Sequence, residues 1–254
     1  MNEVKDYWQK ATPMNFVDEK WNYEQKRTFR YSLQDYMHQA IGFGDWKDKK
    51  VLEFGCGSGI DALEFAQNGA EVTAVDITEN AIALTEALSR EAGIPIEVVQ
   101  ISDVLPFPDD SFDLVYSFGV LHHIPNVNDT LTEIHRVLKP NGSIIAMMYN
   151  KDSLLYAYSV VYLHGLKDKL FLDGFCNATM NRLTSQYSER IEGCPYTKVY
   201  TKNEAQELFE QYFTNVSVSV HYNVIDTPSQ RKVKLDISDE HELGWHLLIQ
   251  GLKR

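Results

Sequence analysis

Three glycines at alternate positions follow a short apolar run near residue 50. The segment Val51–Gly59 reads VLEFGCGSG, and Asp76 lies 17 residues after it, at the end of a second apolar run. Glycines in such a turn let a ligand approach the backbone without meeting a Cβ atom. A carboxylate at the end of the next strand is placed to accept hydrogen bonds from a ribose diol. The order strand, glycine turn, helix, strand, acid predicts a site for a cofactor that contains a nucleoside.

The spacing of the glycines distinguishes between classes of cofactor. A dinucleotide site requires G-x-G-x-x-G, but the third position after Gly57 is Ile60, and the third glycine is Gly59. Glu53 lies two residues before Gly55, where a carboxylate would repel a pyrophosphate. The same carboxylate suits a cofactor that carries a sulfonium and an ammonium group.

The motif E-x-G-x-G-x-G, formed by Glu53 and the three glycines, resembles motif I of class I S-adenosylmethionine-dependent methyltransferases. The segment Phe107–Ser117 and its continuation Phe118–Pro125, FGVLHHIP, are similar to the fourth strand and following loop of the small-molecule branch of that family, often labelled type 11. The resemblance covers residues 50–150 closely and 201–250 in outline. It implies S-adenosylmethionine as cofactor and in-line methyl transfer to oxygen or nitrogen of a small molecule or small peptide.

The resemblance implies roles for residues at the ends of the predicted strands. Asp76 would hold the ribose, although it is also placed to cap the helix that begins near Glu79. Asp103 would accept a hydrogen bond from the adenine amino group, or be a plain loop carboxylate. Phe118 would lie along the methionine portion, and Arg30 could bind the cofactor carboxylate. The expected cofactor-binding residues are Arg30, Glu53, Gly55, Gly57, Gly59, Asp76, Ile77, Ser102, Asp103 and Phe118.

Two adjacent histidines, His122 and His123, fall where the substrate nucleophile would meet the methyl group. Methyl transfer mostly requires alignment, with a base only when the nucleophile has a proton to lose. Histidine suits that role near neutral pH, so both are candidate catalytic residues. Alternatively, one histidine caps the next helix and the other packs beneath it. The residues expected to bind the substrate are Tyr149, Asn150, Arg190 and Tyr196.

Strand and helix patterns alternate along the chain. The predicted strands are 51–54, 72–75, 96–100, 113–118, 143–149, 214–224 and 245–250, and the predicted helices include 59–68, 79–91 and 127–138. Strands separated by helices of this length imply right-handed crossovers and a parallel sheet. We therefore expect the α/β class, with a doubly wound, Rossmann-like, seven-stranded sheet of the class I methyltransferase type. The resemblance implies that its last strand is antiparallel.

We expect a single domain over residues 1–254. Its parts are a helical amino-terminal cap (1–48), a cofactor-binding core (49–150), a substrate-covering insertion after the fifth strand (151–200) and a terminal helix with strands (201–254). In the cap, one helix should carry the apolar spacing from Leu33 to Ile41 and end at Gly42. Tyr7 and Trp8 are candidates for a lid over the cofactor.

The insertion begins with an aromatic and aliphatic pattern over residues 154–166 that predicts a helix, followed by an irregular stretch through Tyr196. The helix fits a dimer face, a lid or plain core, so a homodimer stays open.

The charge and the cysteines restrict the partners. The chain has 24 basic and 36 acidic residues, a net charge of −12, which opposes binding to nucleic acid. Cys56, Cys176 and Cys194 have no metal-ligand spacing, and the histidines form no H-E-x-x-H pattern, so no metal is expected. No run approaches the roughly 18 apolar residues of a membrane span, and Met1–Asp6 contains no apolar leader. We expect a cytoplasmic protein without a membrane partner.

Two competing functions belong to other classes. One is a nicotinamide-dependent oxidoreductase, which the missing third fingerprint glycine disfavours. The other is a non-catalytic protein that keeps the cofactor fold and binds a partner through the aromatic insertion, residues 151–200.

Overall fold

The chain forms one seven-stranded sheet, with a small two-stranded sheet beside it. The computed structural model describes residues 2–11, 21–102, 104–167, 177–189, 193–226, 232–237 and 242–254. The strands of the large sheet are β1 (Lys50–Phe54), β2 (Glu71–Asp76), β3 (Glu97–Gln100), β4 (Phe112–Phe118), β5 (Leu138–Tyr149), β6 (Phe213–His221) and β9 (His246–Lys253). Their order is β3-β2-β1-β4-β5-β9-β6. Strands β1 to β5 pair in parallel, while β9 is antiparallel to both its neighbours. The predicted fold class is confirmed.

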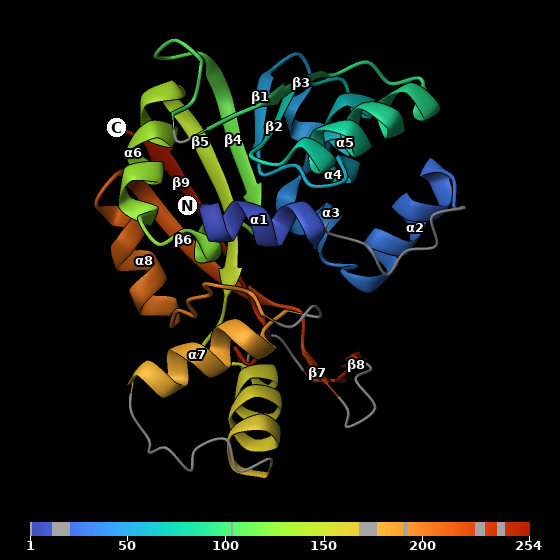
Figure 1. The fold of residues 1–254 in the computed structure, drawn as a ribbon. Coiled ribbons are helices and arrows are strands. Elements are labelled where there is room, and N and C mark those ends of the chain that lie inside the picture. The colour runs from blue at the N-terminus through green and yellow to red at the C-terminus, as the bar shows by residue number, and fades with distance from the viewer. Residues whose placement is uncertain are drawn as a thin grey trace.

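Helices cover both faces of this sheet (Figure 1). Helices α4 (Ile60–Gln67) and α5 (Glu79–Ala92) lie on one side, and α6 (Val127–Val137) and α8 (Lys202–Glu210) lie on the other. Each face carries its own cluster of buried apolar side chains. The described residues include no helix long and apolar enough to cross a membrane.

Local hydrogen bonds define the ends of α5 and α8. The Thr78 side chain accepts a hydrogen bond from the backbone N–H of Ala81, and Gly93 ends α5 with a φ of 67°. Thr201 and Glu204 form a capping box at the start of α8. These motifs depend on hydrogen bonds between residues three apart, so the sequence alone specifies them.

The predicted helix with apolar spacing from Leu33 to Ile41 is divided in the structure, whereas its predicted end at Gly42 is confirmed. Helices α1 (Asn2–Lys10) and α2 (Tyr23–Leu33) come first, and the short α3 (Met37–Ile41) then ends at Gly42. The helix is interrupted between α2 and α3 because Tyr36 and Met37 make contacts with the rest of the fold. The Tyr36 hydroxyl lies 2.7 Å from His246 Nδ1, its ring stacks on His221, and Met37 is completely buried.

The insertion is more regular than predicted. The predicted helix 154–166 is a π-helix, η3 (Tyr156–Lys167), and the stretch expected to be irregular contains α7 (Asn177–Tyr187). The two helices pack through long-range contacts, including a hydrogen bond of 2.9 Å between the Tyr156 and Thr184 hydroxyl groups. They lie beyond the carboxyl end of β5 (Figure 1).

The predicted strand 214–224 is two strands in the structure. Strand β6 ends at His221, and Val224 begins β7 (Val224–Asp226), which pairs with β8 (Lys232–Lys234) in the small sheet. Tyr222, with a φ of 68°, lies at the change of direction.

A buried carboxylate joins the cap to the sheet. Arg30 on α2 donates to Asp61 on α4 through Nη2 (2.7 Å) and Nε (3.2 Å). The hydroxyl groups of Tyr31 and Tyr116 donate to the same carboxylate at 3.0 and 2.9 Å. Asp61 therefore links α2, α4 and strand β4 through four hydrogen bonds.

We expect Asp61→Ala to lower the free energy of unfolding by about 3–5 kcal/mol, because it leaves the Arg30 guanidinium buried without its partner. Urea denaturation measures this loss. Asp35→Ala is the control: it removes an exposed ion pair with Lys234 and should cost at most about 1 kcal/mol. Equal losses in the two variants would contradict the central role of Asp61.

Candidate functional site

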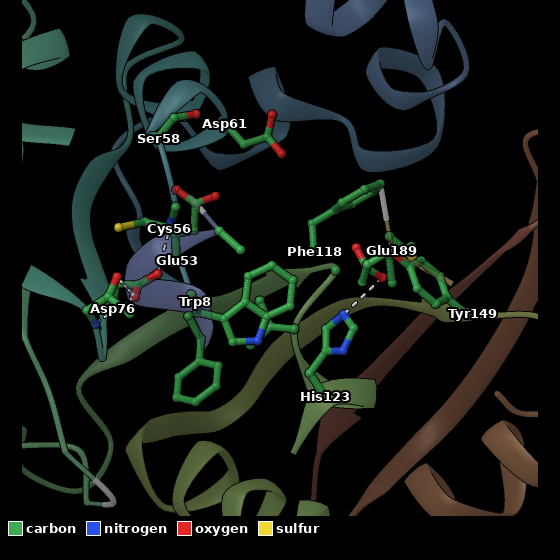
Figure 2. A pocket seen from close by; sticks show the side chains of 18 of the residues that line it. Trp8, Glu53, Cys56, Ser58, Asp61, Asp76, Phe118, His123, Tyr149 and Glu189 are labelled. Atoms are coloured by element: carbon green, nitrogen blue, oxygen red, sulfur yellow. Dashed lines mark hydrogen bonds and ion pairs between the residues drawn. The ribbon is translucent and has the colours of Figure 1, made fainter. Parts of the chain in front are cut away.

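A cavity of about 570 Å³ opens at the carboxyl ends of β1, β2, β4 and β5. Figure 2 shows its side chains converging from these strands, from α1 and from the insertion. In parallel sheets with helices on both faces, this edge is where ligands bind. The sequence-predicted residues on its wall are Arg30, Glu53, Gly55, Gly57, Asp76, Ile77, Phe118, His123 and Tyr149.

Several predicted residues lie elsewhere. His122 is completely buried, and Ser102 is exposed outside the cavity wall. Asn150 is buried, and its side-chain amide donates to the backbone carbonyls of Glu242 and Gly244, at 3.2 and 2.9 Å. The two remaining residues that do not line the wall are Gly59, at the start of α4, and Tyr196. Asp103 and Arg190 lie outside the described residues.

The glycine turn is held against the end of β2. The backbone N–H groups of Gly55 and Cys56 both donate to the Val75 carbonyl, at 2.8 and 2.9 Å. Gly55 has a φ of 81°, and a Cβ atom there would lie 2.4 Å from the Val120 side chain. The turn therefore requires glycine both for its backbone conformation and for its close packing.

Asp76 stabilises the turn and also faces the cavity. Its Oδ2 accepts from the Gly57 N–H at 3.1 Å, and its Oδ1 accepts from the backbone and hydroxyl of Thr78, both at 2.9 Å. Burial raises its pKa, and these hydrogen bonds oppose that rise. A carboxylate has about four acceptor positions, so Oδ2 can still accept from a ligand hydroxyl. Thr78, not Asp76, caps α5.

Glu53 is a buried carboxylate on the same wall. Its side chain is 4% exposed, and its Oε2 has no hydrogen-bond partner among the described residues. Burial, followed by the charge of nearby Asp61, raises its pKa well above the usual range. An unsatisfied buried acceptor is costly. A ligand that brings a cation or N–H donor to this atom would remove that cost.

The structure distinguishes between the two histidines. His123 lines the cavity, and its Nε2 forms an ion pair of 3.4 Å with Glu189, which also lines it. Its Nδ1 lies 3.1 Å from both the Tyr196 carbonyl and the Thr197 hydroxyl. His122 lies behind it, with its ring 3.8 Å from that of Tyr149. Nothing in the sequence identified Glu189, because its partner is 66 residues away along the chain.

The pKa values of the two imidazoles are shifted in opposite directions. Burial alone would lower the pKa of His123, but the Cys194 thiol and the Glu189 carboxylate raise it to about 10. Burial and the charge of His123 hold the pKa of His122 well below its usual range. In this state His123 is protonated at neutral pH and donates rather than accepts. A general-base role for either histidine therefore stays a prediction.

Arg30 lies on the wall, and each of its guanidinium nitrogens already donates to a protein side chain. Nε and Nη2 donate to Asp61, Nη1 donates to Gln34, and the group lies 4.7 Å from the centre of the Phe118 ring. The fork that we predicted to bind a cofactor carboxylate is thus occupied by Asp61. Direct contact between Arg30 and a cofactor stays a prediction.

Helix α1 supplies the wall opposite the sheet. Tyr7 and Trp8 line the cavity, and the Trp8 ring meets His123 edge to face at 4.8 Å. Trp8, one of the two predicted lid residues, thus lies next to the cavity-facing histidine (Figure 2).

A family model described as "Methyltransferase domain" matches residues 52–146 of this chain. The ubiquinone biosynthesis O-methyltransferase of Pseudomonas syringae pv. tomato is 33% identical over 115 residues, which are 44% of this chain and 50% of that protein. The Pseudomonas aeruginosa enzyme of the same name is 31% identical over the same share of each chain. The chain spans about half the length of these curated relatives.

Solved structures resemble nearly the whole chain. A protein from Pyrococcus horikoshii aligns with a TM-score of 0.63 and 20% identity, covering 98% of this chain and 99% of that one. A SAM-dependent methyltransferase from Methanosarcina mazei aligns with a TM-score of 0.59 and 22% identity, covering 84% of this chain and 96% of that one. At such identities the likeness shows a common fold.

The glycine turn gives a matched pair of substitutions. Gly55→Ala and Gly93→Ala both place a side chain at positive φ, but a Cβ at Gly93 meets nothing within 4 Å. Both should lose about 1–2 kcal/mol of stability from backbone strain. Gly55→Ala should lose about 1–3 kcal/mol more from the clash with Val120. Thermal denaturation compares the two, and equal losses would show that the turn has room for a methyl group.

Proposed function

We propose that this chain, whose residues 52–146 match the methyltransferase domain model, transfers the methyl group of S-adenosylmethionine to oxygen or nitrogen of a small molecule or small peptide. The observation that carries this proposal is the buried Glu53 side chain, whose Oε2 has no partner among the described residues, on the same glycine-lined wall as Asp76. The two acids match the ammonium and ribose groups of this cofactor.

The residues present fit the cofactor. Glu53 would receive the ammonium group, and the free acceptor capacity of Asp76 would receive a ribose hydroxyl. The Gly55 and Gly57 turn leaves room for the backbone to approach the ligand. A nicotinamide dinucleotide would instead bring a pyrophosphate towards Glu53, so the oxidoreductase alternative fits this wall poorly.

Bound S-adenosylmethionine supplies a methyl group on positively charged sulfur, which an acceptor atom attacks in line. The protein has to align the acceptor and exclude water. Aromatic side chains at one end of the cavity provide flat apolar walls, and they are Trp8, Phe118, Tyr149, Tyr222 and Trp245. His123 and Glu189 are the polar groups at this end, and we assign His123 as the histidine that meets the acceptor.

The relatives named ubiquinone biosynthesis O-methyltransferase support oxygen as the acceptor atom. The aromatic walls suit a planar acceptor, since stacked rings bury large apolar areas. The net charge of −12 and the buried free thiols of Cys56 and Cys194 support a role in a reducing cytoplasm without nucleic acid. A homodimer and the partner-binding alternative would both use residues 151–200. A lack of cofactor binding would favour the partner-binding alternative.

Calorimetric titration with S-adenosylmethionine and S-adenosylhomocysteine tests the proposed cofactor, with Asp76→Ala as the site variant. The substitution should weaken binding by about 1–3 kcal/mol, roughly 5- to 150-fold, because a charged hydrogen-bond partner of the ribose is lost. Asp76→Asn should lose less, and the exposed control Asp35→Ala should bind normally. Wild-type affinity in Asp76→Ala would overturn the ribose assignment, and the absence of any binding would overturn the function.

Binding of the cofactor should also release a proton from Glu53. In the empty site its raised pKa favours the neutral carboxyl group, whereas a bound ammonium group favours the carboxylate. Affinity should therefore rise with pH between the ordinary pKa of a glutamate, about 4.3, and the raised pKa of Glu53, and be constant above it. The binding enthalpy should vary with the ionisation enthalpy of the buffer. Glu53→Gln should abolish this variation, and its persistence there would assign the proton to another group.

A further inference from the structure

Three side chains that can bind a metal ion meet behind the acceptor end of the cavity. Ligand atoms of His122, His123 and Glu189 all lie within 4.8 Å of one another. The two histidines come from η2 (Leu121–His123), next to the end of β4, and the glutamate follows α7 in the insertion. Figure 2 shows His123 and Glu189 directed towards each other. The tertiary structure therefore brings together a cluster that the spacing of these residues in the sequence did not predict.

His122 indicates that a partner belongs in this cluster. It is completely buried, and although the Met147 backbone lies close to the ring, neither ring nitrogen meets the geometry of a hydrogen bond to the described residues. Buried polar atoms are nearly always satisfied, and an exception calls for an ion or water. A neutral imidazole is the form that binds a metal ion.

The geometry around His123 has the features of a metal ligand. Its Nε2 lies 3.4 Å from Glu189 Oε1, and two ligands bound at about 2.0–2.2 Å to one tetrahedral ion are separated by roughly the same distance. Its Nδ1 lies 3.1 Å from the Tyr196 carbonyl, an acceptor of the kind that orients metal-bound histidines through the other ring nitrogen. A dication would replace the Nε2 proton and face the same carboxylate.

We propose that His122, His123 and Glu189 bind one divalent first-row transition-metal ion, of which Zn²⁺ is the representative. Two imidazoles and one carboxylate suit such an ion, whereas Mg²⁺ and Ca²⁺ prefer sites built from oxygen ligands. Because all the ligand atoms lie within 4.8 Å of one another, small shifts of these side chains would bring them to the spacing around a tetrahedral ion.

The ion would give the acceptor end a specific chemistry, and this step rests on the proposed function. Three protein ligands leave a coordination position open, and His123 and Glu189 both line the cavity. An acceptor hydroxyl bound there would lose its proton more readily, because the dication stabilises the oxyanion. The favoured substrates are then hydroxylated rings that offer oxygen to the metal.

The test is metal titration of chelator-treated full-length protein. Wild type should bind one equivalent of Zn²⁺ by calorimetry, and one equivalent of Co²⁺ with visible absorption typical of four- or five-coordination. His123→Gln and Glu189→Gln should each weaken binding at least about tenfold to a hundredfold, the range seen even for outer-shell changes. His135→Gln, on α6 away from the cavity, should bind as wild type does.

Each outcome decides the proposal. Absence of stoichiometric binding to wild type would show that water or a hydrogen bond satisfies His122. Wild-type affinity for the metal in both His123→Gln and Glu189→Gln would place the ion elsewhere. Thermal denaturation of each variant separates loss of the site from loss of the fold. Binding of S-adenosylmethionine is measured separately, so failure of the proposed function leaves the metal result readable.

Discussion

The architecture of the site depends on the buried carboxylate of Asp61. It accepts hydrogen bonds from Arg30, Tyr31 and Tyr116, and these residues come from α2 and from β4. A buried charge in this position is tolerated only with its partners in place. The cap therefore has one way to dock on the sheet, and that docking completes the wall beside the glycine turn.

The same interaction determines the electrostatics of the cavity. Arg30 is paired with Asp61, and burial and the Asp61 charge outweigh its effect on the pKa of Glu53, whose Oε2 has no partner among the described residues. In the empty site this end of the cavity therefore holds a neutral carboxyl group, which the ammonium group of the proposed cofactor would ionise. At the other end His123 and Glu189 form an ion pair among aromatic rings. The two ends have different chemistry because the first is built by β1, β2 and the glycine turn, and the second by η2 together with the insertion.

The parts of the site that the sequence predicts are formed by residues close together along the chain, and the parts that it misses are formed by residues far apart. The wall formed by Glu53, Gly55, Gly57 and Asp76 was predicted because one strand–turn–helix–strand unit supplies all of it. Asn150 was expected at the substrate, yet its amide is held by the carbonyls of residues 242 and 244. Glu189 was missed because its partner His123 is brought to it by the fold. The break before Met37 has the same cause, since Tyr36 binds His246 from the last strand.

The sequence by itself determined the α/β class, the order of alternating elements, the capped ends of α5 and α8 and the glycine turn. Each of these depends on periodicity or on hydrogen bonds between near neighbours. Only the tertiary structure decided that His123 rather than His122 faces the cavity, that Arg30 is bound by Asp61, and that Glu189 joins the histidines. Those outcomes depend on burial and on charges from distant segments, which have no position in space until the sheet, the cap and the insertion pack together.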